Sequence, residues 1–203
     1  ALGTGLGEGL MQLAPGADYG DPHYSYLARI ETSRQSLGYW LSMAVAPLYL
    51  LGYWHLTRNL APTRPRLGLA LFLFTGYAFV LAISWIGQRY FLAQTVKAIA
   101  AGQADAELLA TFAAHNEPLV NALRVAIVLF SVAWIWLIAT GQSRYPRWMA
   151  LLSPGALLGA IFASYVAAPA FGGWFLPTAM NTAHAVVFLA SLLALVGRGG
   201  RAS

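Results

Sequence analysis

Residues 174–196 read WFLPTAMNTAHAVVFLASLLALV, and this stretch decides the fold class because it is long and apolar enough to cross a bilayer as a helix. Its most polar residues are Asn181 and His184, which are three positions apart and therefore share one helix face. A polar pair in lipid costs free energy unless it faces protein, water or a ligand. The pair therefore indicates either a ligand-binding or catalytic site or hydrogen bonding between helices, and both interpretations stay open.

The composition extends this conclusion to the whole chain. Of the 203 residues, 59% are hydrophobic and 9% are charged, whereas about 25% of residues are charged in an average soluble domain. The absence of cysteine excludes disulfides and thiolate metal sites. The net charge is +5, but the basic residues are scattered around the ends of the apolar blocks, so no nucleic acid partner is expected. No metal or other cofactor is predicted, because repeated His and carboxylate spacings are lacking.

The apolar blocks predict an all-α, polytopic integral membrane bundle that forms one domain over residues 1–203, with five complete spans and a partial or additional N-terminal helix. The spans are expected at about 37–56, 67–90, 119–138, 148–166 and 174–196. The Ala-rich stretch 97–116 is too polar to span and predicts an amphipathic surface helix. Residues 1–15 are glycine-rich, and we expect them to be the outer end of a helix that begins before residue 1. Residues 17–36 predict an extramembrane loop.

The distribution of charge predicts the orientation. The linkers 57–66 and 141–147 and the tail 197–203 contain no acidic residue, and their arginines are Arg58, Arg64, Arg66, Arg144, Arg147, Arg198 and Arg201. The acidic residues all fall on the other side of the predicted bundle: Glu8, Asp18, Asp21, Glu31, Asp105, Glu107 and Glu117. The positive-inside rule therefore predicts a cytoplasmic C-terminus and an outward-facing N-terminal region.

This orientation places polar residues from several spans in the outer part of the membrane. We expect them to form an outward-facing polar and aromatic pocket for a membrane lipid or another lipophilic small molecule. The candidate catalytic residues are His184, Glu8 and Glu117, and the candidate substrate-binding residues are Asn181, Arg124, Asn121, Arg89, Tyr165 and Trp85. For Arg124 a second interpretation stays open, in which it reaches the outer surface and pairs with Glu117 or Glu107.

Such a pocket would suit acid/base conversion of the bound molecule by an isomerase, cyclase or hydrolase, because His and Glu side chains exchange protons. The residues do not decide whether the chain is an enzyme. A first alternative is a non-catalytic structural or assembly subunit of a larger membrane complex, with other membrane subunits as partners. A second is a small-solute transporter, which is disfavoured because the spans carry no proton-relay carboxylate and show no half-repeats.

Overall fold

The structure is a computed structural model that describes residues 1–199, with the side chains of residues 1–196. Every regular element of these residues is a helix, which confirms the all-α prediction. In chain order they are α1 (Leu2–Gln12), η1 (Ser25–Arg29), α2 (Thr32–Val45), α3 (Leu48–Leu60), α4 (Pro65–Ala100), α5 (Glu107–Ala139), η2 (Arg147–Leu152), α6 (Pro154–Ala167), α7 (Pro169–Gly172), η3 (Leu176–Thr178) and α8 (Ala179–Gly199). The side chains of the tail arginines Arg198 and Arg201 lie outside the described residues.

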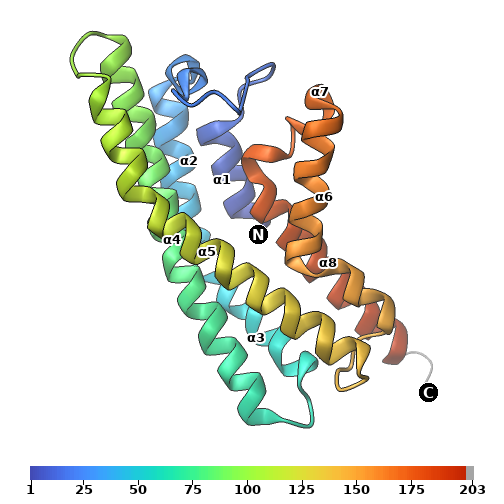
Figure 1. Cartoon of the computed structure of the whole chain (residues 1–203). Helices are drawn as coiled ribbons and strands as arrows, with labels where there is room; N and C mark the ends of the chain where they lie inside the picture. The colour runs from blue at the N-terminus through green and yellow to red at the C-terminus, as the bar shows by residue number, and fades with distance from the viewer. Residues whose placement is uncertain (200–203) are drawn as a thin grey trace.

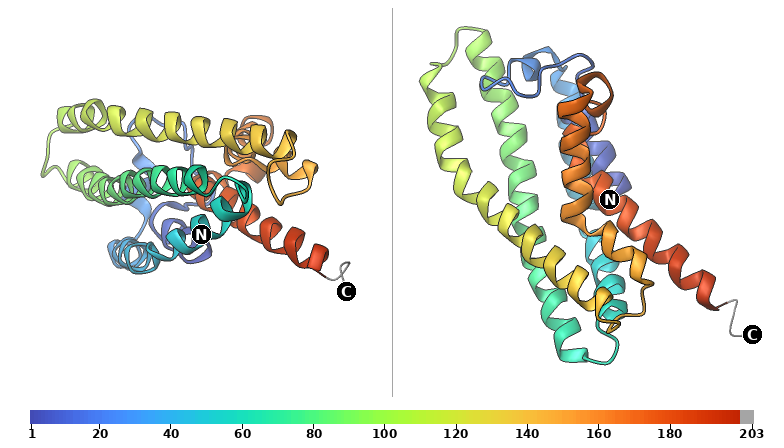
Figure 2. Two further views of the ribbon diagram at one scale, coloured as in Figure 1. Left: turned by 90° about the horizontal axis from the view of Figure 1, so that it is seen from below. Right: turned by 45° about the vertical axis from the view of Figure 1, so that its right-hand side comes forward.

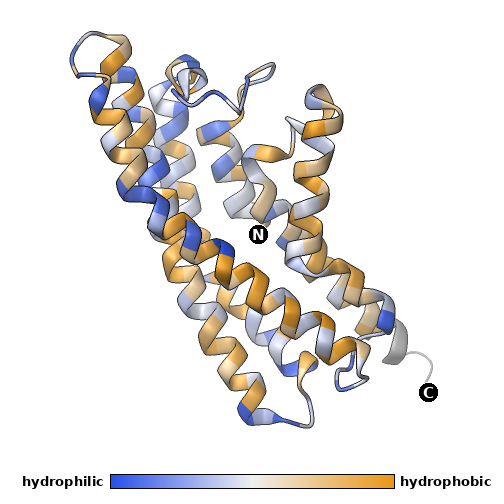
Figure 3. Ribbon diagram, viewed as in Figure 1, coloured by the Kyte–Doolittle hydropathy of each residue, from blue (hydrophilic) through white to orange (hydrophobic). Residues whose placement is uncertain are grey.

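The two longest helices, α4 and α5, run side by side along one side of the molecule, and the other helices pack beside them (Figure 1). Seen from below, α5, α4 and the α2–α3 pair follow one another across the bundle (Figure 2). Apolar residues cover most of the surface of the long helices, and hydrophilic residues gather at the helix ends and along the outer half of α5 (Figure 3). Here "outer" means the end of the bundle that carries residues 13–31.

In the part of the chain that the structure describes, three segments are both long enough and apolar enough to cross a membrane, which supports a membrane protein. They are Pro65–Ala100, Glu107–Ala139 and Leu176–Val196. The first two end at a glycine in the left-handed region, Gly102 with φ of +70° and Gly141 with φ of +72°. This conformation suits glycine and lets the following amides close the last helical turn, with Gln103 N donating to Ala98 O at 2.8 Å.

Prolines divide the other expected spans into shorter pieces. The predicted span 37–56 is two helices that meet at Ala46 and Pro47, because proline cannot donate the backbone hydrogen bond that a continuous helix requires. The predicted span 148–166 is η2 followed by α6, which begins anew at Pro154 with the Ser153 hydroxyl accepting a bond from Ala156 N.

The stretch 97–116 differs from the surface helix that we expected. It comprises the end of α4, a turn at residues 101–106 and the first turns of α5. The Ala-rich composition extends α5 toward its N-terminus, so that Pro118 lies inside the helix instead of in its first turn. Sequence periodicity does not distinguish a helix that lies on the membrane surface from the polar extension of a longer helix.

The apolar core is in two parts. The larger part joins α3, α5, η2 and α8 around the fully buried Trp134, Leu56 and Val187. The smaller part holds the outer loop on α4 through Leu27, Tyr26, Ile30, Leu92, Ala93, Val96 and Leu109. Residues 13–31 are therefore a packed lid over the outer end of the bundle, and side chains of α2 and α4 add hydrogen bonds to their backbone, including Gln35 Nε2 to Leu27 O at 3.1 Å.

Helices α1 and α2 approach so closely that there is no room for side chains between them. A Cβ atom built on Gly38 would lie 2.4 Å from the Gly7 carbonyl oxygen, and one built on Gly7 would lie 2.2 Å from Ser42 Oγ. Both distances are shorter than any ordinary contact. This crossing fixes α1 against α2 and brings its polar face, with Thr4 and Glu8, toward the centre of the bundle.

Candidate functional site

Seven polar side chains from four helices meet inside the bundle, and we call them the buried polar cluster. They are Thr4 and Glu8 of α1, Ser42 of α2, Tyr49 and Tyr53 of α3, and Asn181 and His184 of α8. The exposed fraction is 2% for Glu8, 5% for Asn181 and 4% for His184. Three of the predicted site residues therefore lie in one buried cluster.

Asn181 is the central member because it bonds to two other helices. Its Oδ1 accepts from the hydroxyls of Thr4 and Tyr49, and its Nδ2 donates to Glu8 Oε2. The side chain therefore joins α1, α3 and α8. The Thr4 hydroxyl also donates to the Ala1 carbonyl oxygen at 3.0 Å, so the buried Glu8 carboxyl and Tyr49 hydroxyl depend on Asn181 more than Thr4 does.

His184 occupies the next turn of α8. Its Nδ1 faces the Met180 carbonyl oxygen at 2.7 Å, and its Nε2 bonds to the Tyr53 hydroxyl. The imidazole ring also packs edge-on against Tyr49 and Tyr53, with ring centroids 5.5 Å apart in both cases. A donor is required toward the Met180 carbonyl, so the Nδ1–H tautomer fits and Tyr53 donates to Nε2.

The local sequence explains why these partners meet. Tyr49 and Tyr53 are four residues apart in α3, so they share a helix face, as Asn181 and His184 do in α8. Gly52 lies between the tyrosines, and a Cβ atom there would come within 2.6 Å of the Phe188 ring. The absence of a side chain at Gly52 thus allows α3 and α8 to approach within hydrogen-bonding distance.

A small cavity of about 30 Å³ borders His184 and Tyr53 on the side of α4 and α5. Its other walls come from Phe74, Ala126 and Phe130, among others. A volume of this size holds about one water molecule. The cluster is therefore closed, and a larger molecule would have to displace some of its side chains.

Arg89 and Trp85 lie at the outer edge of the cluster, beneath the loop. The Arg89 guanidinium stacks on the rings of Tyr24 and Trp85, at 5.1 Å from each centroid. It interacts electrostatically with the Glu8 carboxyl. Within the described residues its Nε is buried without a hydrogen-bond partner, and so is Nε2 of Gln12, one turn from Glu8 on α1.

Glu117, Asn121 and Arg124 do not join the cluster. Arg124 Nη1 bonds to Glu117 Oε1 at 2.9 Å and to Asn121 Oδ1 at 2.8 Å. The Arg124 and Glu117 side chains are 63% and 55% exposed. The structure therefore agrees with the second interpretation of Arg124, as a surface residue paired with Glu117, and separates it from the buried His184.

Tyr165 also lies away from the cluster and anchors the outer loop instead. Its hydroxyl accepts from the Tyr19 backbone amide at 3.1 Å.

In the same loop the Asp21 carboxylate accepts from the amides of His23 and Ser25 and from the Ser25 hydroxyl, and these bonds lower the pKa of Asp21. Burial raises the pKa of the neighbouring Tyr26 to about 12. The described residues include no group of three or more metal-ligating side chains.

Sequence reasoning missed Thr4, Tyr49 and Tyr53 as partners of the cluster. The signal for the tyrosines was present, because two phenols four residues apart inside an apolar span need hydrogen-bond acceptors as much as Asn181 and His184 need partners. Thr4 carried no such signal, because a threonine in a helix usually satisfies its hydroxyl on the backbone of its own helix.

Comparison with protein families identifies the family of this chain. The model of a family described as "Family of unknown function (DUF6796)" matches residues 6–197. No curated protein and no solved structure matches the chain.

Proposed function

The chain belongs to this family of unknown function, and we propose that it binds the polar end of a lipophilic small molecule beside Glu8 and Asn181. The bound molecule would enter from the lipid or from the outer end of the bundle. Its polar end would meet the carboxyl and amide groups of α1 and α8, and its apolar part would lie among aromatic side chains.

The observation that carries this proposal is unused hydrogen-bonding capacity next to the Glu8–Asn181 pair. Gln12 Nε2 and Arg89 Nε are buried donors that have no partner among the described residues. A buried donor that lacks an acceptor costs about 1–3 kcal/mol. A ligand oxygen that accepted from either group would recover this free energy, and this requirement favours a ligand with a carbonyl, carboxylate or phosphate oxygen at its polar end.

We further propose that Glu8 and His184 are the groups that would exchange protons if the bound molecule is converted. Both side chains can donate or accept a proton, and both are held in place by hydrogen bonds, which acid/base catalysis requires. Glu117 is not part of this proposal, since it is exposed and paired with Arg124.

A structural role is the second candidate, and a different observation favours it. The hydrogen bonds of the cluster link α1, α3 and α8 to one another, and the cavity beside His184 is only about 30 Å³. Polar residues that bond across helices stabilise membrane bundles without any ligand. In this case the chain would be a structural or assembly subunit of a membrane complex.

We also propose that the chain crosses the membrane five times, with α2–α3 and η2–α6 as the two crossings that a proline divides. The charges support this arrangement, because Arg58, Arg64, Arg66 and Arg144 lie in or next to the α3–α4 and α5–η2 connections. These connections are at the end of the bundle away from the outer loop (Figure 1). The positive-inside rule makes that end cytoplasmic. The C-terminus would then be cytoplasmic too.

Mass spectrometry of the molecules retained by the purified protein tests the binding proposal. We expect a lipophilic molecule to co-purify with the wild-type protein and to be reduced about tenfold or more in Glu8→Gln and Gln12→Leu, which remove one polar contact each. His184→Ala tests the second proton-exchanging group, and His115→Ala is its matched control. His115 is exposed on α5, and its ring bonds to the Thr111 carbonyl in its own helix.

Equal retention in wild-type, Glu8→Gln and Gln12→Leu proteins that unfold at the same temperature would contradict ligand binding at the cluster. Lower unfolding temperatures in Glu8→Gln and His184→Ala, with no retained molecule in any variant, would favour the structural candidate. Conversion would show as a change in the chromatographic retention time of the retained molecule, or in its mass if the reaction is a hydrolysis. This change should disappear in His184→Ala and persist in His115→Ala.

A further inference from the structure

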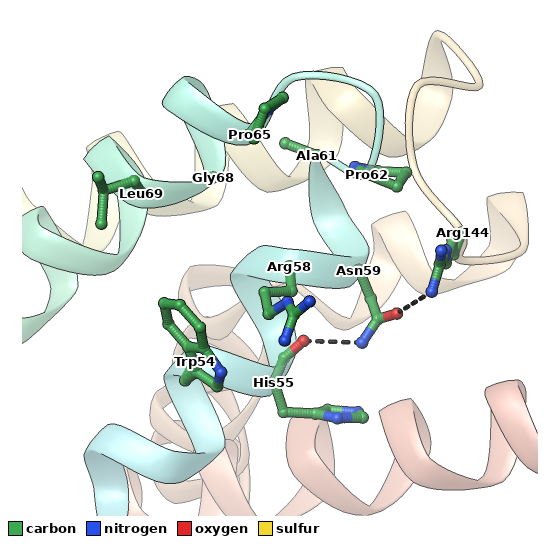
Figure 4. Close-up of a pocket in the computed structure, with 10 residues that line it drawn as sticks. All are labelled: Trp54, His55, Arg58, Asn59, Ala61, Pro62, Pro65, Gly68, Leu69 and Arg144. Carbon is green, nitrogen blue, oxygen red and sulfur yellow. Dashed lines mark hydrogen bonds between the residues drawn. The ribbon is translucent and has the colours of Figure 1, made fainter.

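A second, larger pocket lies at the other end of the bundle from the outer loop, between α3, the connection at residues 61–64 and the start of α4 (Figure 4). Its volume is about 640 Å³. Small-molecule sites in proteins have volumes of about 300–1,000 Å³. The pocket shares no residue with the buried polar cluster, so it is a separate candidate binding site.

The polar wall of this pocket is basic. Arg58 and Arg144 both line it, together with His55 and Asn59, and none of its lining residues is acidic. The Arg58 guanidinium lies over the Trp54 ring, 5.4 Å from the centroid (Figure 4). Stacking on an aromatic face holds a guanidinium in place and leaves its N–H groups directed sideways toward other acceptors.

Arg144 reaches the pocket from the α5–η2 connection because its backbone is fixed to the end of α3. Its amide donates to the Asn59 carbonyl oxygen at 2.8 Å, and its Nη1 donates to Asn59 Oδ1 at 3.4 Å. Asn59 is held in turn by the bond from its Nδ2 to the His55 carbonyl oxygen at 2.8 Å. His55 Nε2 is 3.0 Å from Ser191 Oγ of α8. The two guanidinium groups thus come from distant parts of the chain. That of Arg144 is positioned by its bond to Asn59, and that of Arg58 by stacking on Trp54.

The other wall is apolar and continues onto the outside of the bundle. Leu69 of α4 lines the pocket and is exposed, and Leu73, one turn further along α4, is exposed as well. Trp54 is exposed on the facing helix and packs edge-on against Phe72 with ring centroids 5.1 Å apart. The pocket therefore has a basic end and an apolar flank that follows the length of α4.

We propose that this pocket binds the phosphate group of an anionic membrane lipid, with Arg58 and Arg144 donating to the phosphate oxygens and the acyl chains lying along Leu69 and Leu73. Guanidinium groups match phosphate geometry and form strong charge-assisted hydrogen bonds with it. Basic pockets between membrane helices bind lipid headgroups on the cytoplasmic side, where anionic lipids are abundant. The orientation expected from the charge distribution places this pocket on that side.

Lipid titration of the full-length protein, followed by native mass spectrometry, tests this assignment. The probes are phosphatidylglycerol, phosphatidylcholine and inorganic phosphate. We expect phosphatidylglycerol to bind more tightly than phosphatidylcholine, and Arg58→Gln and Arg144→Gln each to weaken its binding about tenfold, as the loss of a charge-assisted hydrogen bond implies. Arg58→Lys, which keeps the charge, should retain part of the affinity.

Arg66→Gln is the matched control, because Arg66 is an exposed arginine in the first turn of α4 that does not line the pocket. Equal phosphatidylglycerol affinity in Arg58→Gln and Arg66→Gln would overturn the proposal. Equal affinity for phosphatidylcholine would also overturn it, since the headgroup charge would then not be recognised. If inorganic phosphate binds as tightly as the lipid, the site belongs to a free anion and the lipid assignment fails. Unfolding temperatures show whether a variant is destabilised. If one is, the phosphatidylglycerol affinities of Arg58→Lys and Arg58→Gln are compared, and equal affinities would overturn the role of the Arg58 charge.

Discussion

Asn181 is the residue whose replacement tests the buried polar cluster most directly. Asn181→Ala leaves the Glu8 carboxyl and the hydroxyls of Thr4 and Tyr49 buried without their common partner. We expect a loss of about 3 kcal/mol in the free energy of unfolding, because each unpaired buried polar group costs about 1–3 kcal/mol. Denaturant unfolding in detergent micelles, followed by tryptophan fluorescence, measures this loss.

Asn121→Ala is the control for this experiment, since Asn121 is exposed on α5 and contacts only Arg124 among the described side chains. Its effect should stay within about 0.5 kcal/mol, as is usual for surface positions. If both variants lose the same stability, the loss cannot be assigned to the cluster and its structural importance is refuted.

Individual residues also show how far the sequence could predict the site. Asn181, His184 and Glu8 were identifiable because a polar group in an apolar segment must have a partner. Arg124 and Asn121 met the same criterion, but the outer half of α5 faces away from the cluster, and which face of a helix turns inward depends on packing against other helices. The pocket around Arg58 and Arg144 was not predictable either. One arginine belongs to α3 and the other to the α5–η2 connection, and the bonds from Arg144 to Asn59 that bring them together cannot be inferred from the sequence.

At the scale of elements, the crossing of α1 and α2 depends on two glycines. Gly38→Ala would place a Cβ atom 2.4 Å from the Gly7 carbonyl oxygen, so the two helices would have to separate. We expect a destabilisation of about 2 kcal/mol or more, the usual cost of overpacking. It is measured as a lower midpoint of denaturant unfolding.

Gly159→Ala should have the opposite sign, because a Cβ atom at Gly159 would meet nothing within 4 Å. Alanine is favoured over glycine in a helix by up to about 1 kcal/mol. Two glycine-to-alanine changes with opposite effects would establish that contact distance, and not helix propensity, controls the α1–α2 crossing. Destabilisation of equal size in both would contradict this explanation.

The outer loop contains a hydrogen-bonded carboxylate, Asp21, and we expect its protonation to loosen the loop. Hydrogen bonds from Ser25 and His23 lower the pKa of Asp21 below its ordinary value of 3.8. A lowered pKa in the folded state means that the carboxylate stabilises the loop at pH values above 3.8, and that this contribution is lost as the pH falls through the lowered pKa. We therefore expect the protection factors of the amides of residues 21–25, each the intrinsic exchange rate divided by the observed rate at the same pH, to fall in acid. Asp21→Asn should already have low protection factors at neutral pH, without a further fall in acid. An acid dependence that persists in Asp21→Asn would assign it to another group.

The prolines explain why the element boundaries were harder to predict than the fold class. Hydropathy identified the apolar blocks, and α4, α5 and the η3–α8 segment agree with it. It did not locate the breaks at Pro47 and Pro154, because a proline in an apolar block can either kink a continuous helix or separate two helices. Packing against α1 and α5, which hydropathy does not describe, decides between these outcomes.

For the whole molecule, the five-crossing arrangement predicts which connections share a side of the membrane. The chain has no cysteine, so a single introduced cysteine can be labelled uniquely. We expect Thr63→Cys and Ser143→Cys to resist a membrane-impermeant maleimide in intact cells, and Asp18→Cys and Gln103→Cys to react. Permeabilised cells provide the control in which all four should react. Labelling of Thr63→Cys and Gln103→Cys from the same side would refute a crossing by α4.

The proline-divided helices also affect how the chain reaches its place in the bilayer. Among the described residues, only the segments Pro65–Ala100, Glu107–Ala139 and Leu176–Val196 combine the length and hydropathy of a spanning helix. During synthesis α2 and α3 emerge before any of these segments, and the bonds from Tyr49 to Asn181 and from Tyr53 to His184 cannot form until α8 is made. We therefore expect α2 and α3 to wait at the insertion machinery for the α4–α5 hairpin, and the last helix to complete integration of the first ones. The helices of this protein would then be integrated into the membrane in a different order from the one in which they are translated.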